Sequence, residues 1–190
     1  MLTRTRHLEE WGTWAPSDGE LVDGLLGLPV PSLRLPSTAG GEADLAELSR
    51  QPLVLYVHPG TETKPELRED PDGLLGTGCT VQSRVFEDYE PDFARRAVRI
   101  VGLSARSRED QRKLIFRARL TFGMLSDQAL ALADALGLPT YTAATGERVY
   151  QRLAFFAREG VIEKVFYPVP IPRRNAIDIL SWMAKQGPDL

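Results

Sequence analysis

Apolar residues occur along the chain both in continuous runs and at helical spacing, and the two patterns together predict an α/β protein. Continuous apolar runs at 53–57 and 98–103 predict two strands that are buried on both faces of a sheet. Apolar positions three and four residues apart predict helices over 80–93 and 108–120. Because strands and helices alternate, we expect a sheet that is flanked by helices.

Shorter elements and turn residues complete the pattern. Asp127 is expected to cap a helix over 128–136, which Gly137 ends. Glu159-Gly160 has the composition of a tight turn and predicts a hairpin. The remaining predicted elements are strands at 33–36, 122–125, 152–157 and 161–166, a brief helix or turn at 42–48 and a final helix over 175–185. A hairpin beside strand–helix alternation favours a mixed central sheet.

The length and composition predict one domain with an N-terminal extension and a long insertion loop. A chain of 190 residues with 43% hydrophobic residues corresponds to a single folded domain, at roughly 150 residues per domain. We expect this domain over 21–190, preceded by an N-terminal extension over 1–20. The stretch at about 60–78 is charged and rich in glycine and proline, which predicts a long insertion loop.

Composition also limits the function classes. Lys+Arg 23 against Asp+Glu 26 gives a net charge of −3, which disfavours a nucleic-acid partner because phosphate binding needs excess positive charge. Apolar runs stay well short of the roughly 18 residues that span a bilayer, so we expect a cytoplasmic protein without a membrane partner. Two histidines and one cysteine are too few soft ligands for a conventional zinc site, so no metal is expected.

Cys79 is the main candidate for chemistry. It lies at the start of the helix expected from residue 80, where free backbone N–H groups and the helix dipole favour thiolate over thiol. Free cysteines are often buried only for packing, which is the alternative interpretation. Gly76-Thr77-Gly78 and Thr80 around it form a small polar setting, which favours a reactive cysteine.

The segment Gly78-Cys79-Thr80-Val81-Gln82 resembles the cysteine motif of peroxiredoxins of the bacterioferritin-comigratory, or Q, type. Five more segments resemble motifs of that family in the same order: Leu-Tyr-Val-His-Pro at 55–59, Phe-Glu-Asp at 86–88, Val-Gly-Leu-Ser at 101–104, Phe-Gly-Met-Leu-Ser-Asp at 122–127 and Val-Phe-Tyr-Pro-Val at 165–169. The last segment, followed by Asn175 and Trp182, resembles the closing strand and helix of the family. The resemblance extends from about residue 21 to 183.

This resemblance implies a thioredoxin-like fold and a thiol peroxidase that needs no metal or organic cofactor. Cys79 matches the peroxidatic cysteine, whose thiolate attacks a hydroperoxide and becomes a sulfenic acid. Arg152 matches the arginine that lowers the pKa of this thiol and stabilises the transition state. Gln82 matches the polar residue that orients the arginine, and Pro59 matches the proline that shields the thiolate from water.

One departure from the family pattern concerns the peroxide pocket. Where the family commonly has a Thr or Ser three residues before the cysteine, this chain has Gly76. Thr77, Thr80 or Thr61 could supply the missing hydroxyl to the substrate, and the sequence does not choose between them. His58 could act as a base, although we interpret it as a histidine at the end of a strand without a catalytic role.

The second departure concerns recycling. Many relatives have a resolving cysteine five residues after the first, and this chain has Arg84 there. We therefore expect a 1-Cys enzyme whose sulfenic acid is reduced by an external thiol, either a low-molecular-weight thiol or a thioredoxin-like or glutaredoxin-like protein. Monomer and homodimer both stay open. The alternative function is a catalytically weak redox sensor or interaction module.

Overall fold

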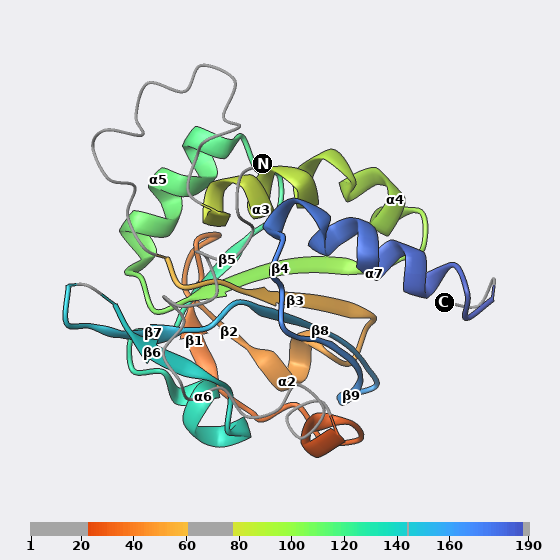
Figure 1. Ribbon diagram of the computed structural model, residues 1–190, viewed down its shortest axis with the longest axis horizontal. Coiled ribbons are helices and arrows are strands. Elements are labelled where there is room, and N and C mark those ends of the chain that lie inside the picture. Colours follow the sequence, from red (N-terminus) through yellow and green to blue (C-terminus); the bar gives the residue numbers. More distant parts are fainter. Residues whose placement is uncertain (1–22, 61–77, 144, 188–190) are drawn as a thin grey trace, which may run out of the picture.

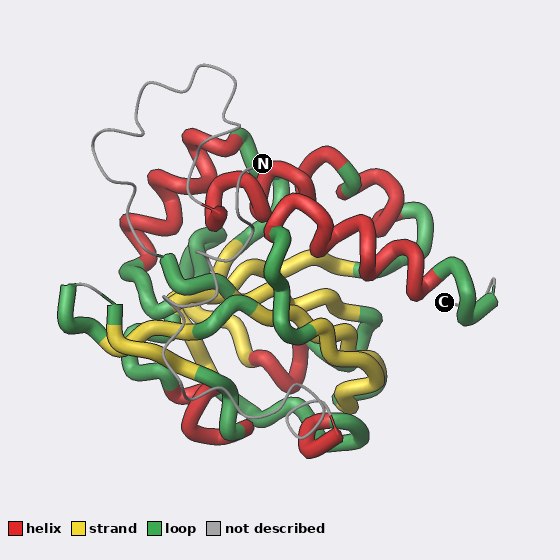
Figure 2. The backbone as a smooth tube through the Cα atoms, viewed as in Figure 1, coloured by secondary structure: helices red, strands yellow, loops and turns green. Residues whose placement is uncertain are grey.

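The computed structural model describes residues 23–60, 78–143 and 145–187. The predicted N-terminal extension over 1–20 and nearly all of the insertion loop predicted at about 60–78 lie outside these residues. Within the described part, the strands and helices form a central sheet with helices on both sides (Figure 1). Figure 2 shows the strands as a layer between these helices.

The central sheet of the described part has five strands in the order β5-β4-β3-β8-β9. Strand β3 pairs in parallel with β4 and antiparallel with β8, so the sheet is mixed as predicted. Its strands are β3 (Leu53–Val57), β4 (Arg99–Ser104), β5 (Met124–Ser126), β8 (Leu153–Arg158) and β9 (Val161–Phe166). Two small antiparallel pairs accompany it, formed by β1 (Arg34–Pro36) with β2 (Glu42–Asp44) and by β6 (Thr140–Thr142) with β7 (Arg148–Tyr150).

The helices divide between the two faces of the sheet. Helices α3 (Gly78–Asp88), α4 (Glu90–Ala94), α5 (Arg108–Ala118) and α7 (Asn175–Met183) lie on one face, and the short helices α2 (Leu45–Leu48) and α6 (Ala131–Leu136) lie on the other (Figure 1). A 3-10 turn, η2 (Pro172–Arg174), leads into α7. The continuous apolar run of β3 serves both faces, because Val54 and Tyr56 belong to one hydrophobic core and Leu53, Leu55 and Val57 belong to the other.

Several predicted elements have different bounds in the structure. The helix predicted over 80–93 begins two residues earlier, at Gly78, and is interrupted at Tyr89. Pro91 lacks the N–H that a continuous helix would need, and it lies instead in the first turn of α4. The region 42–48 contains both a short strand and a short helix.

Two further differences lie in the second half of the chain. Helix α6 begins at Ala131 rather than at residue 128, and its N-cap residue is Leu130. Asp127 still accepts the first N–H groups of the helix, those of Ala131 and Leu132, with its two carboxylate oxygens at 2.9 Å each. The hairpin of β6 and β7 was not predicted, since strands of three residues carry no recognisable apolar run.

Candidate active site

The candidate nucleophile, Cys79, is the second residue of α3. Its side chain is 4% exposed and forms no disulfide. The first N–H groups of a helix have no partner within the helix, and they lie at the positive end of its dipole. The position therefore favours a negative charge on sulfur, although the burial opposes it.

Arg152 lies against this thiol. It comes directly before β8, in a short connection from β7, and it is 7% exposed. Its Nη2 donates to the Cys79 Sγ at 3.4 Å, across 73 positions of sequence. A Cβ added at Gly78 would approach the same Nη2 to 3.0 Å, so the glycine leaves room for the guanidinium beside the helix. The contact joins a permanent cation to a buried sulfur.

Two opposing influences set the acidity of the thiol. Burial raises the pKa of Cys79, because a thiolate away from water loses its hydration. The charge of Arg152 is the largest influence in the other direction, and the imidazole of His58 adds to it. The outcome is a pKa lowered from 9.0 to about 5. At neutral pH the sulfur is almost entirely thiolate, which is its nucleophilic form.

A chain of buried hydrogen bonds holds the guanidinium in place. Arg152 Nη1 donates to Gln82 Oε1, and Gln82 Nε2 donates to Asn175 Oδ1 at 2.8 Å. Gln82 is fully buried and Asn175 is 2% exposed. Since both ends of the Gln82 amide have partners, its orientation is fixed, and with it the orientation of the arginine.

A second chain of hydrogen bonds supports the backbone of the cysteine. Tyr56 Oη donates to Ser83 Oγ at 3.0 Å, and Ser83 Oγ donates to the carbonyl of Cys79, also at 3.0 Å. All three residues are buried. Strand β3 is thereby connected to the first turn of α3, which fixes the helix start against the sheet.

His58 follows β3 and is 1% exposed. Its imidazole is close enough to the thiol to lower the pKa of Cys79, and its ring stacks on Tyr56 with centroids 5.9 Å apart. Neither ring nitrogen has a hydrogen-bond partner among the described residues. His58 therefore influences the thiol from nearby, without a hydrogen bond of good geometry.

The structure brings together Cys79, Gln82 and Arg152 from the predicted site. Pro59 is buried next to His58, and Thr80 is half-buried beside the cysteine, whereas Thr77 lies outside the described residues. Asn175 was not among the predicted site residues, although it belongs to the family resemblance. Its role has no local signal, because its partner Gln82 is 93 positions away along the chain.

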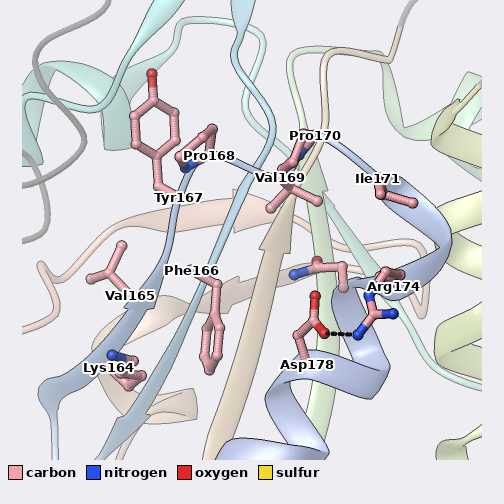
Figure 3. Close-up of a pocket in the computed structure, with 11 residues that line it drawn as sticks. Lys164, Val165, Phe166, Tyr167, Pro168, Val169, Pro170, Ile171, Arg174 and Asp178 are labelled. Atoms are coloured by element: carbon pink, nitrogen blue, oxygen red, sulfur yellow. Dashed lines mark hydrogen bonds and ion pairs between the residues drawn. The ribbon is translucent and has the colours of Figure 1, made fainter. Parts of the chain in front are cut away.

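A groove of about 400 Å³ lies next to this site but does not contain the thiol (Figure 3). It is lined by residues 164–171, by Arg174 at the end of η2 and by the start of α7, where Asp178 forms an ion pair with Arg174 at 3.1 Å. Asn175 is shared between the groove and the hydrogen-bond chain that leads to Arg152. The groove and the thiol are thus separated by the residues that support the arginine.

The described residues contain neither a cluster of metal ligands nor a membrane-spanning helix. No group of three or more His, Cys, Asp or Glu side chains among them could hold a metal ion. Nor does any helix within the described ranges have the length and apolar character needed to cross a membrane.

Comparisons with known proteins agree with the predicted resemblance. A model of the Redoxin family matches residues 25–180. The chain is 25% identical over 142 residues to the chloroplastic peroxiredoxin Q of Sedum lineare, which covers 74% of this chain and 67% of that protein.

Solved structures agree with the fold. The crystal structure of peroxidoxin BcpB from Mycobacterium tuberculosis superimposes with a TM-score of 0.68 at 22% identity, covering 85% of this chain and 97% of that one. Peroxiredoxin Q of Xanthomonas campestris gives a TM-score of 0.67 at 21% identity, covering 86% and 98%. They confirm the predicted thioredoxin-like α/β fold with a mixed sheet.

Proposed function

The chain belongs to the Redoxin family, and within it to the thiol peroxidases of the bacterioferritin-comigratory, or Q, type of peroxiredoxin. From this we propose that it works by a one-cysteine mechanism with Cys79 as its peroxidatic residue. One observation carries the proposal: a buried thiol lies 3.4 Å from the guanidinium of Arg152 and has a pKa of about 5. Its substrate is a hydroperoxide, either hydrogen peroxide or an organic one.

In the first half-reaction the Cys79 thiolate attacks one oxygen of the peroxide. The S–O bond forms as the O–O bond breaks, so sulfur is oxidised to a sulfenic acid and the other oxygen leaves as water or an alcohol. Negative charge moves from the sulfur to the leaving oxygen, and Arg152 stabilises it along this path. We assign Gln82 and Asn175 as positioning residues, since they hold the guanidinium through the hydrogen bonds described above.

The remaining predicted residues line the peroxide pocket in this proposal. Buried Pro59 excludes water from the thiolate, which keeps the electrostatic interaction with Arg152 strong. Thr80, Thr77 and Thr61 are the candidates for a hydroxyl that hydrogen-bonds the peroxide. Thr77 and Thr61 lie outside the described residues and stay predictions from the sequence alone.

The second half-reaction needs a thiol from outside the chain. Cys79 is the one cysteine of this sequence, and Arg84 occupies the place of a resolving cysteine. The sulfenic acid therefore condenses with an external thiol to a mixed disulfide, which a second thiol reduces. We propose a low-molecular-weight thiol or a thioredoxin-like or glutaredoxin-like protein as this reductant.

Location, assembly and domain bounds complete the proposal. A cytoplasmic location fits the mechanism, because reducing compartments keep thiols reduced and supply the external thiol. The site described above is built from one chain, so a monomer or a homodimer would serve equally. We retain 21–190 as the peroxidase domain, with 1–20 as an extension.

Stopped-flow mixing of the reduced protein with hydrogen peroxide tests the proposal. Tryptophan fluorescence follows the reaction, and a sulfenic-acid trap followed by peptide mapping locates the product. We expect a second-order rate constant at least a hundredfold above that of an ordinary thiol, a trapped sulfenic acid on Cys79, and loss of both in Cys79→Ser. A rate equal to that of an ordinary thiol would refute the peroxidatic assignment.

A further inference from the structure

We propose that Tyr167 and Gln151 are positioning residues that hold the backbone of Arg152, so that its guanidinium stays against the Cys79 sulfur. The inference rests on the proposed function, because it concerns the cation that activates the peroxidatic thiol. Gln82 holds the guanidinium end of the arginine side chain. The other end needs to be held as well, since the whole side chain moves with its Cα.

The first argument is the place of Arg152 in the chain. Gln151 and Arg152 form the two-residue connection between β7, which ends at Tyr150, and β8, which begins at Leu153. Neither residue belongs to a strand, so contacts other than the ladder of the sheet must fix their backbone. Arginine has a long side chain, and a small rotation at its Cα becomes a larger displacement at Nη2, the atom that donates to the sulfur at 3.4 Å.

The second argument is that Gln151 is held by two hydrogen bonds to different segments. Its backbone N–H donates to the carbonyl of Pro139, just before β6, at 2.9 Å. Its side-chain Oε1 accepts the hydroxyl of Tyr167, just after β9, at 2.6 Å. Gln151 is 6% exposed, and a buried amide oxygen is costly to leave without a donor. The connection before Arg152 is therefore fixed through both the backbone and the side chain of Gln151.

The third argument is that Tyr167 is itself well placed to act as an anchor. It directly follows Phe166, the last residue of β9, which pairs with Ala154 near the start of β8. Its ring is half-buried and packs against one of the two hydrophobic cores. The position of the tyrosine hydroxyl is thus set by the sheet that also carries the arginine.

The two ends of the arginine are held from one stretch of the chain. Tyr167 reaches the backbone end through Gln151, and Asn175 reaches the guanidinium end through Gln82. Tyr167 and Asn175 both line the groove beside the site (Figure 3). The segment 167–175 therefore determines where the guanidinium lies relative to the thiol, although Tyr167 was not among the predicted site residues.

The test removes the hydrogen bond between these residues from either side. Tyr167→Phe keeps the ring and removes the donor, and Gln151→Met keeps an unbranched side chain and removes the acceptor. Tyr89→Phe is the matched control, because it removes a hydroxyl at the far end of α3, ten positions after Cys79. For each variant, thiolate absorbance near 240 nm recorded against pH gives the pKa of Cys79. Stopped flow then gives the rate with hydrogen peroxide above that pKa.

We expect the pKa of Cys79 to rise from about 5 to about 6 in Tyr167→Phe, because the charge of Arg152 lies farther from the sulfur. The rate above this pKa should fall about tenfold, since a misplacement well below 1 Å already slows a positioned reaction. Gln151→Met should give the same changes, and it decides the question if Tyr167→Phe does not fold. Tyr89→Phe should match the wild type.

A second background shows whether the effect passes through the arginine. In Arg152→Met, the further change Tyr167→Phe should leave both the thiol pKa and the rate where Arg152→Met alone puts them. The same rise or the same loss in that background would overturn the positioning role, as would wild-type values in Tyr167→Phe. A wild type that reacts no faster than an ordinary thiol would instead overturn the proposed function itself.

Discussion

Replacing Arg152 by methionine removes the permanent charge next to the thiol while keeping an unbranched side chain of similar reach. The guanidinium donates to the sulfur from 3.4 Å and is itself 7% exposed, so water screens the interaction little. Its loss leaves the thiolate buried with only His58 to favour it, and the Gln82 carbonyl oxygen loses its donor.

The expected magnitude follows from the acidity of the thiol. With a pKa of about 5, about 99% of Cys79 is thiolate at pH 7. If the pKa returns to its ordinary 9.0, about 1% is thiolate at the same pH. The rate with hydrogen peroxide at pH 7 therefore falls about 100-fold from the thiolate fraction alone, and the lost stabilisation of the leaving oxygen lowers it further.

Two measurements separate these effects. Thiolate absorbance near 240 nm, recorded against pH, gives the pKa of Cys79 in Arg152→Met. Stopped-flow rates above that pKa then give the loss in the chemical step. Arg99→Met is the matched control, because Arg99 is exposed and begins β4 at the end that pairs with Leu53, the opposite end of β3 from His58. A thiol pKa that stays below about 6, with a rate within tenfold of the wild type, would refute the role derived for Arg152.

Three further outcomes follow from the same geometry. Asn175→Ala leaves the Gln82 amide without its acceptor. We therefore expect a slower peroxide reaction and, in urea denaturation, a free energy of unfolding lower by about 1–3 kcal/mol. An unchanged rate would mean that the Gln82 amide holds the guanidinium without help from Asn175. Gly78→Ala places a Cβ 3.0 Å from both Arg152 Nη2 and Pro172 Cγ, so the thiol pKa should rise, and a titration identical to that of the wild type would contradict this. The pKa of the wild-type thiol is lowered, so its thiolate is present above about pH 5 and is lost below it. The rate of the peroxide reaction should therefore be level from about pH 6 to 8 and fall about tenfold per pH unit below about 5. A midpoint of this pH profile near about 8 would contradict the derived acidity.

Much of the sheet could be predicted from the sequence because its central strands carry continuous apolar runs. β3 and β4 lie within one residue of their expected bounds, and the hairpin turn at Glu159-Gly160 joins β8 and β9 as its composition indicated. Local signals of this kind failed where an element was too short to show a period, as in β6, or where a proline divided one apolar pattern into two helices.

The candidate site, too, could be predicted from the sequence only in part. Cys79 was recognisable from its flanking residues and its place at a helix start, and the family resemblance identified Gln82 and Arg152. The resemblance also included Asn175, but neither its hydrogen bond to Gln82 nor the burial of His58 had a signal in the sequence. Both depend on which segments pack together: Asn175 meets Gln82 only after α7 lies beside α3, and His58 influences the thiol only once β3 is joined to α3 by the Tyr56–Ser83 hydrogen bond.

The reactive thiol is assembled from segments that are far apart along the chain, with Arg152 73 positions and Asn175 96 positions after Cys79 (Asn175 is 93 after Gln82). An unfolded or newly made chain therefore carries an ordinary thiol, which is mostly protonated at neutral pH and slow to react with oxidants. Peroxide reactivity arises only when the sheet has closed and the arginine has reached the sulfur. The cysteine is thus protected chemically while the protein folds, and the appearance of thiolate absorbance at neutral pH reports when the arginine has reached the sulfur.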